Sequence, residues 1–119
     1  MLSSQNRLRK KSDINNVFKE GRTVAGNFIF LRAAKNKLNT NRFAFVVSFK
    51  VSPKSVLRNK IKRRLREAVK KIIPEIKRGF DFIIIAKPEI IDKKFKAIQE
   101  EINEIFNFKF DKIIPKKRF

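Results

Sequence analysis

Hydrophobic residues recur along this chain with the spacing of helices in some segments and of strands in others. Ile14, Val17 and Phe18 form the i, i+3, i+4 stripe of a short amphipathic helix. Ser12 is its predicted N-cap, and Gly21 is expected to end it. The first predicted element is therefore a short helix that follows a basic segment.

Two extended segments come next, at residues 24–35 and 42–50, and an asparagine-rich polar turn separates them. Side chains of the second segment alternate between two faces of the strand. One face carries Phe43, Phe45, Val47 and Phe49, and the other carries Ala44, Val46, Ser48 and Lys50. We expect the phenylalanine face to be core and the smaller, partly polar face to be open.

The first extended segment leaves two interpretations of its aromatic residues. Alternation places Phe28, Phe30 and Arg32 opposite Ile29 and Leu31. Phenylalanines beside an arginine on an open face would form a stacking surface for unpaired bases. Alternatively, Phe28 and Phe30 are ordinary core residues, and the strand pattern alone does not decide between the two.

The longest amphipathic segment runs from residue 52 to residue 73. Ser52 and Pro53 are typical of a helix start, and Pro74 is expected to end the helix. Its apolar residues fall on one arc: Leu57, Ile61, Leu65, Ala68, Val69 and Ile72. Asn59, Arg63, Arg66 and Lys70 cluster on the far side. The segment therefore predicts a helix with one buried and one strongly basic face.

Two elements complete the chain. Residues 82–86 are apolar without alternation, which predicts a strand covered on both faces that pairs in parallel with an earlier strand. Residues 92–107 predict a last helix, with these residues inward: Phe95, Ile98, Ile102, Ile105 and Phe106. The order of elements predicts one α+β sandwich over residues 1–119, with a basic arm at 1–11 and a loose tail at 109–119.

The charge of the chain indicates the class of its partner. Its 119 residues include 31 Lys and Arg against 11 Asp and Glu, a formal net charge of +20. Such an excess favours a polyanionic partner. No apolar run reaches the roughly 18 to 20 residues that cross a bilayer, and the N-terminus lacks the apolar core of a signal peptide. We therefore expect a cytoplasmic protein with no membrane contact.

The residue types that are missing exclude several chemistries. The chain has no Cys and no His, so zinc fingers, iron–sulfur ligation, thiol nucleophiles and Ser-His-Asp catalysis are excluded. Glu100, Glu101 and Glu104 could hold Mg²⁺, but their lysine-rich helical surroundings favour a solvated face. We expect no catalytic residue and no protein-bound metal in this chain.

Two features of the basic helix indicate contact with nucleic acid. Glu67 is the only acid between Ser52 and Pro74, whereas solvated helices usually mix charges of both signs. Asn59 is unfavourable inside a helix, but its amide can both donate and accept hydrogen bonds. The basic face is therefore expected to contact RNA.

Residues 50–68 read KVSPKSVLRNKIKRRLREA, and this segment resembles the signature Arg-Asn-x-x-Lys-Arg-x-x-Arg of the bacterial ribonuclease P protein subunit. The Leu8–Lys11 opening, Val17, Phe18 and Gly21 agree upstream, and the segment DFIIIAKP at 81–88 agrees downstream. The resemblance covers residues 7–106. Ile14 and Arg32 stand where aromatic residues are usual, and Phe49 stands where a lysine is usual.

The resemblance implies a two-layer α/β sandwich whose mixed four-stranded sheet has a left-handed βαβ crossover, like the second domain of a small-subunit ribosomal protein. It also implies a monomeric subunit of an enzyme, one copy per RNA, whose RNA partner cleaves the 5′ leader of precursor tRNA with Mg²⁺ bound mainly by the RNA.

Two sets of residues follow from the resemblance and from the basic helix face. The set expected to bind the catalytic RNA is Arg58, Asn59, Lys60, Lys62, Arg63, Arg66 and Lys70. The set expected to bind the leader is Ile14, Phe18, Phe28, Phe30, Arg32, Ser48 and Lys50. The alternative is a ribosomal or architectural nucleic-acid-binding protein without an enzyme context.

Overall fold

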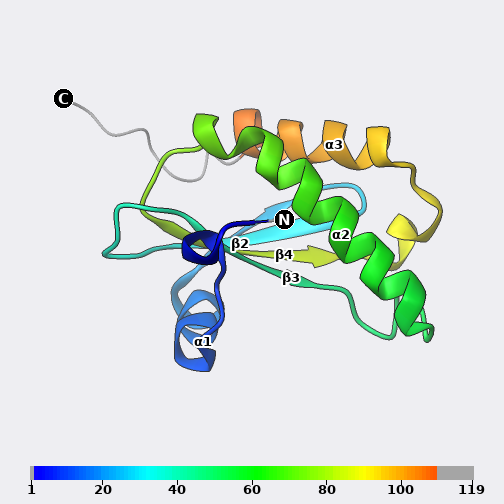
Figure 1. Cartoon of the computed structure of the whole chain (residues 1–119), viewed down its shortest axis with the longest axis horizontal. Coiled ribbons are helices and arrows are strands. Elements are labelled where there is room, and N and C mark those ends of the chain that lie inside the picture. Colours follow the sequence, from blue (N-terminus) through cyan, green and yellow to red (C-terminus); the bar gives the residue numbers. More distant parts are fainter. Residues whose placement is uncertain (1, 110–119) are drawn as a thin grey trace.

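The computed structural model describes residues 2–109 and shows a mixed four-stranded sheet with helices on both faces (Figure 1). The helices and strands are α1 (Lys11–Glu20), β1 (Arg22–Ala25), β2 (Ile29–Lys35), β3 (Arg42–Val46), α2 (Ser55–Ile72), β4 (Phe80–Ala86) and α3 (Phe95–Glu104). The strand order is β1-β2-β4-β3. Only β3 and β4 pair in parallel, across the connection made by α2, so the predicted parallel pairing and α+β class are confirmed.

Strand β4 is buried on both faces, which explains its apolar run without alternation. Phe82 and Ile84 face the layer formed by α2 and α3, where the main core lies. Ile83 faces the opposite side and packs with Leu8 and Val17 beneath α1. The main core is therefore a two-layer sandwich, and α1 covers only part of the second face (Figure 1).

The predicted arc of α2 is confirmed from Ile61 onward, because Ile61, Leu65, Ala68, Val69 and Ile72 are all buried, while Leu57 in the first turn is half-buried. The predicted start of this helix is wrong. It begins at Ser55, and the buried Ser52 instead accepts a hydrogen bond from the Lys54 amide at 3.1 Å. Ser52 therefore closes a turn that precedes the helix.

The predicted boundaries differ at other elements as well. The strand predicted at 42–50 ends at Val46, and the helix predicted at 92–107 is α3 followed by a π-helical turn. Helix α1 begins at Lys11, so Ser12 lies inside its first turn and does not cap it. The predicted strand at 24–35 is two strands, β1 and β2, joined by a turn at Gly26 and Asn27. A Cβ atom at Gly26 would lie 2.7 Å from Glu101 Oε2 and 2.8 Å from the Ile29 carbonyl oxygen, so this turn requires glycine.

Glu101 holds the β1–β2 turn to α3. Its carboxylate accepts the backbone N–H groups of Asn27, Phe28 and Ile29 at 2.8–2.9 Å, and its side chain is buried. The expectation that Glu100, Glu101 and Glu104 share a solvated face is therefore wrong for Glu101, because the turn supplies three donors that replace water.

The inward residues of the last helix are confirmed, since Ile98, Ile102, Ile105 and Phe106 are buried and Phe95 packs against the core. Within residues 2–109, no helix combines the length and apolar character that a bilayer crossing requires. The predicted loose tail lies outside the described residues, except for Lys109 at the end of a π-helical turn.

Replacing Glu101 by alanine should lower the free energy of unfolding by about 3 kcal/mol or more, because buried N–H groups lose a charged acceptor. Urea denaturation followed by circular dichroism measures this change. Glu100→Ala is the matched control on the exposed side of the same helix and should stay within about 0.5 kcal/mol of the wild type. Equal stability of both variants would contradict an anchoring role for Glu101.

Candidate nucleic-acid interface

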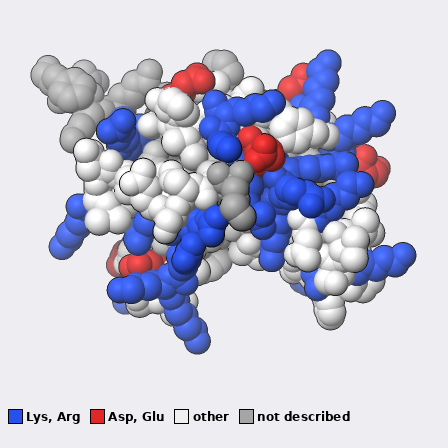
Figure 2. Space-filling model, in the orientation of Figure 1, with Lys and Arg blue, Asp and Glu red and all other residues white. Residues whose placement is uncertain are grey.

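Helix α2 presents its polar side to solvent as the sequence predicts. Asn59, Lys60, Arg63 and Lys70 are exposed, while the opposite side of the helix lies on the sheet and on α3. Figure 2 shows Lys and Arg side chains gathered over the helix, with few acidic groups among them. This exposed side of α2 is therefore a row of cations, which we call the exposed rod and which suits a polyanionic backbone better than a single small anion.

The other predicted RNA-binding residues of α2 are half-buried and have more specific neighbours. Arg58 lies over the ring of Phe49, with its guanidinium carbon 4.8 Å from the ring centroid, and donates a hydrogen bond to the Ser52 carbonyl. Lys62 and Arg66 line a cavity between α2 and the edge strand β3. The predicted set is therefore divided between the exposed rod, the turn before α2 and this cavity.

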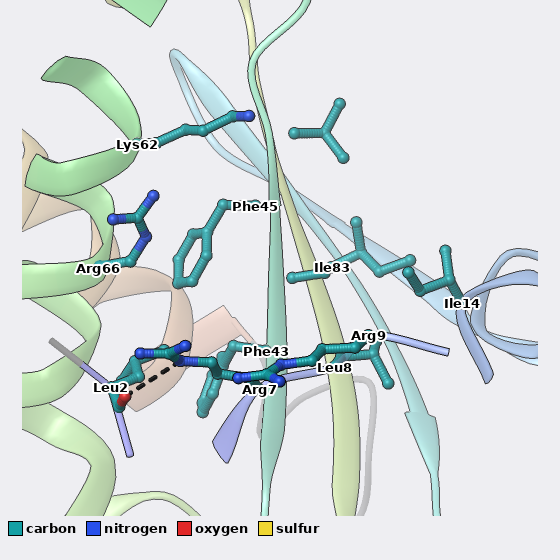
Figure 3. A pocket seen from close by; sticks show the side chains of 12 residues that line it. Leu2, Arg7, Leu8, Arg9, Ile14, Phe43, Phe45, Lys62, Arg66 and Ile83 are labelled. Atoms are coloured by element: carbon teal, nitrogen blue, oxygen red, sulfur yellow. Dashed lines mark hydrogen bonds between the residues drawn. The ribbon is translucent and has the colours of Figure 1, made fainter. Parts of the chain in front are cut away.

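The cavity has a volume of about 560 Å³ and joins the two faces of the sheet around the edge of β3. In Figure 3, Lys62 and Arg66 extend from α2 toward Phe45, and Arg7 and Arg9 approach from the N-terminal segment. The rest of its lining is apolar: Leu2, Leu8, Ile14, Phe43, Ala44, Val46 and Ile83. Four cations around an apolar floor suit a nucleotide, which combines a phosphate with a flat base.

Backbone pairing with β3 fixes the N-terminal segment at this cavity. Arg7 forms an isolated parallel bridge with Phe43, and the Leu8 amide donates to the Phe43 carbonyl at 2.9 Å. Leu8 is buried beneath α1, and its neighbours Arg7 and Arg9 both line the cavity. The basic arm is therefore part of the site and not only a source of charge.

A second surface lies beside α1, on the part of the sheet that α1 leaves uncovered (Figure 1). Phe30, Ile85 and Val46 are in register across three strands and form its floor. Phe30 is half-buried, and the Lys87 ammonium lies 6.0 Å from its ring centroid. Phe18 of α1 is 46% exposed, and Arg32 of β2 donates to its carbonyl oxygen at 2.6 Å, so Phe18 borders this surface. We call the surface formed by these sheet residues and the adjoining side of α1 the cleft.

Two arginines fix α1 beside the cleft. Arg42 pairs with Asp81 at 2.7 Å and with Asp13 of α1 at 3.2 Å. The hydrogen bond to buried Asp81 raises the pKa of Arg42. Arg32 donates to the carbonyls of Phe18 and Gly21 at 2.6 and 2.9 Å, where positive charge favours the C-terminus of a helix.

The residues expected to bind the leader do not all lie in one place in the structure. Phe18 and Phe30 lie at the cleft. Ile14, on the side of α1 that packs against the sheet, lines the cavity, and Ser48 and Lys50 are exposed just beyond β3.

The expectation that Phe28 shares the open face is wrong, because the turn held by Glu101 precedes β2 and directs Phe28 into the main core. Arg32 does lie on the cleft face, but its guanidinium is engaged by α1.

Sequence reasoning missed several residues that line these regions. Ile85 was hidden because β4 has no alternation, whereas Val46 was expected on the open face of its strand but was included in neither set. Arg7 and Arg9 could have been found, because the alternation Arg7-Leu8-Arg9 is typical of an extended segment that buries Leu8 and exposes both arginines on the other side. Within the described residues, no three acidic side chains come together as candidate metal ligands.

A basic helix beside a partly exposed aromatic strand face is the arrangement of a candidate nucleic-acid-binding protein. The family model of ribonuclease P matches residues 2–109 of the chain. Among curated relatives, the ribonuclease P protein component of Fusobacterium nucleatum is 38% identical over 105 residues, covering 85% of this chain and 94% of the relative. The corresponding protein of Alkaliphilus oremlandii is 36% identical, with 85% and 88% covered.

Solved structures agree with the sequence relatives. The RNase P protein of Staphylococcus aureus has a TM-score of 0.79 and 31% identity, and the similarity covers 86% of this chain and 93% of that one. The protein of Thermotoga maritima has a TM-score of 0.77 and 28% identity, with 84% and 94% covered. The chain belongs to the ribonuclease P family, as a protein component of the ribonucleoprotein enzyme that processes the 5′ end of tRNA.

Proposed function

We propose that this protein docks on the RNA subunit of ribonuclease P through α2 and holds the 5′ leader of precursor tRNA in the cleft. The observation that carries the proposal is the arrangement of two different surfaces on one small domain. The exposed side of α2 offers charge alone, whereas the cleft offers an aromatic floor and mouth. A paired RNA presents mainly phosphates, and an unpaired strand presents bases that stack.

The cavity at the edge of β3 supports a continuous path between these surfaces. It is lined by Lys62 and Arg66 of α2 on one side and by Ile14 and Val46 of the cleft side on the other. An RNA chain leaving α2 would therefore meet positive charge before it reached the cleft. One monomer per RNA subunit suffices for this arrangement, because both surfaces belong to the same chain.

We assign the cleavage chemistry to the RNA and to Mg²⁺ held mainly by that RNA. The protein would contribute binding, since its cations reduce repulsion between RNA phosphates and its cleft favours a substrate that still carries a leader. This division of roles is consistent with a chain that has neither His nor Cys and has no cluster of acidic ligands within residues 2–109.

Removing two exposed cations of α2 should weaken docking on the RNA subunit. We expect Arg63→Ala with Lys70→Ala to lower the slope of log affinity against log salt by about two, because two phosphate contacts are lost. The matched control is Lys35→Ala with Lys37→Ala, which removes the same charge from an exposed site at the C-terminal end of β2. It should leave the slope close to that of the wild type. Filter binding over a salt series would contradict the proposal if the two double variants behaved alike.

A photo-crosslinker at the mouth of the cleft should label the leader. The chain has no Cys, so Phe18→Cys provides one attachment point. In the assembled holoenzyme, we expect crosslinks to the 5′ leader of precursor tRNA and none to mature tRNA. Leu38→Cys, which is similarly exposed in the β2–β3 connection, is the matched control and should not label the leader. Crosslinks from position 18 to the RNA subunit alone would show that the cleft does not hold the leader.

The protein should lower the Mg²⁺ concentration that the RNA subunit needs for cleavage. The experiment compares RNA alone, protein alone and both together on one precursor tRNA across a Mg²⁺ titration. We expect no cleavage by protein alone and a midpoint at lower Mg²⁺ for the complex. Site-specific cleavage by purified protein would overturn the assignment of chemistry, and an unchanged midpoint would overturn the proposed contribution of the protein.

A further inference from the structure

Phe49 is a large apolar side chain displayed to solvent beside the basic helix. It lies in the turn from Ser48 to Val51, which is closed by a hydrogen bond from the Val51 amide to the Ser48 carbonyl at 3.0 Å. Its side chain is 70% exposed, although Val47 and Val51 are buried. The expectation that Phe49 lies on the core face of the strand is therefore wrong, because β3 ends at Val46 and the chain turns before Phe49. Leaving a ring in water forgoes hydrophobic stabilisation, so an exposed aromatic residue next to a binding surface is a candidate contact.

Arg58 holds this ring in a defined position. Its guanidinium lies over the Phe49 ring at 4.8 Å and donates to the Ser52 carbonyl at 3.1 Å. The carbonyl bond fixes the guanidinium, and the guanidinium covers one part of the ring. Because most of the ring is still exposed, a second flat group has room to stack on it.

The chemistry around Phe49 selects the kind of flat group. Lys50 and Lys54, which both follow Phe49 in the sequence, are exposed, and Arg58 adds a third cation at the ring itself. An acidic peptide would satisfy the charges without using the aromatic ring. An unpaired nucleotide satisfies both, because its base stacks on the ring while its phosphates meet the cations.

We propose that Phe49 stacks on one unpaired base of the RNA subunit of ribonuclease P, with Arg58 as the positioning residue. This inference rests on the proposed docking of α2 on that RNA. The RNA subunit is chosen over the leader because the ring lies against an arginine of α2, whereas the cleft opens on the opposite face of the sheet. In this proposal Arg58 holds the Phe49 ring in position, in addition to any contact it makes with a phosphate.

The absence of Trp and Tyr from the chain allows a direct test. Phe49→Trp introduces the only indole, whose emission should be strongly quenched when the full-length protein binds the RNA subunit, because a base stacks on it. Leu38→Trp is the control at another exposed apolar position and should keep its emission. Quenching at position 49 by a precursor with its leader, but not by the RNA subunit, would assign the site to the substrate and overturn the proposal.

Affinity measurements separate stacking from charge. Phe49→Ala should weaken binding to the RNA subunit about tenfold, and Phe49→Tyr should restore it, because the ring provides the stacking free energy. The salt slope should not change in either variant, because no phosphate contact is removed. Urea midpoints equal to that of the wild type would show that both variants fold.

The possible failures are distinguishable. If Phe49→Ala binds as tightly as the wild type while Arg63→Ala with Lys70→Ala still lowers the salt slope, the stacking site is wrong and docking through α2 stands. If neither set of variants changes binding to the RNA subunit, docking through α2 is wrong and the stacking proposal fails with it.

Discussion

Mutual repulsion among 31 cations, opposed by only 11 acidic residues, is the physical constraint on which the rest of this structure depends. The chain does not use its buried acids to neutralise α2. Asp81 instead pairs with Arg42 and links the end of β4 to α1, and Glu101 binds three backbone amides of the β1–β2 turn. Negative charge therefore holds the scaffold together in places away from the exposed side of α2, where Glu67 is the only acid of the helix.

The same arrangement explains how so small a domain presents distinct surfaces. Burial of β4 on both faces provides a rigid centre, with α2 and α3 on one side and α1 on the other. Since α1 covers only one end of its face, the row Phe30, Ile85 and Val46 is left as a floor. The cavity around β3 is lined by Val46 of this floor and by Lys62 of α2, so the basic surface and the apolar floor adjoin each other.

Long periodic patterns were predictable, and features that depend on distant partners were not. The arc from Ile61 to Ile72 and the buried strand β4 follow from local sequence, because their side chains repeat with the period of the element. The burial of Glu101 does not, since its donors lie more than 70 residues away along the chain. Arg32 was correctly placed on the cleft face, but its engagement by the end of α1 depends on tertiary packing. The β1–β2 turn did have a local signal, Gly26-Asn27, within a segment of otherwise extended character.

The position of β3 has a consequence for the protein before it meets RNA. This strand lies at the edge of the sheet, and the N-terminal segment bridges it only at Phe43. Open sheet edges invite a second copy to pair and begin aggregation. Here Arg7, Arg9, Lys62 and Arg66 border the edge, so two copies approaching edge to edge would bring eight like charges together. The same cations therefore oppose pairing of free copies at this edge, and an RNA bound as proposed would neutralise them while itself covering the strand.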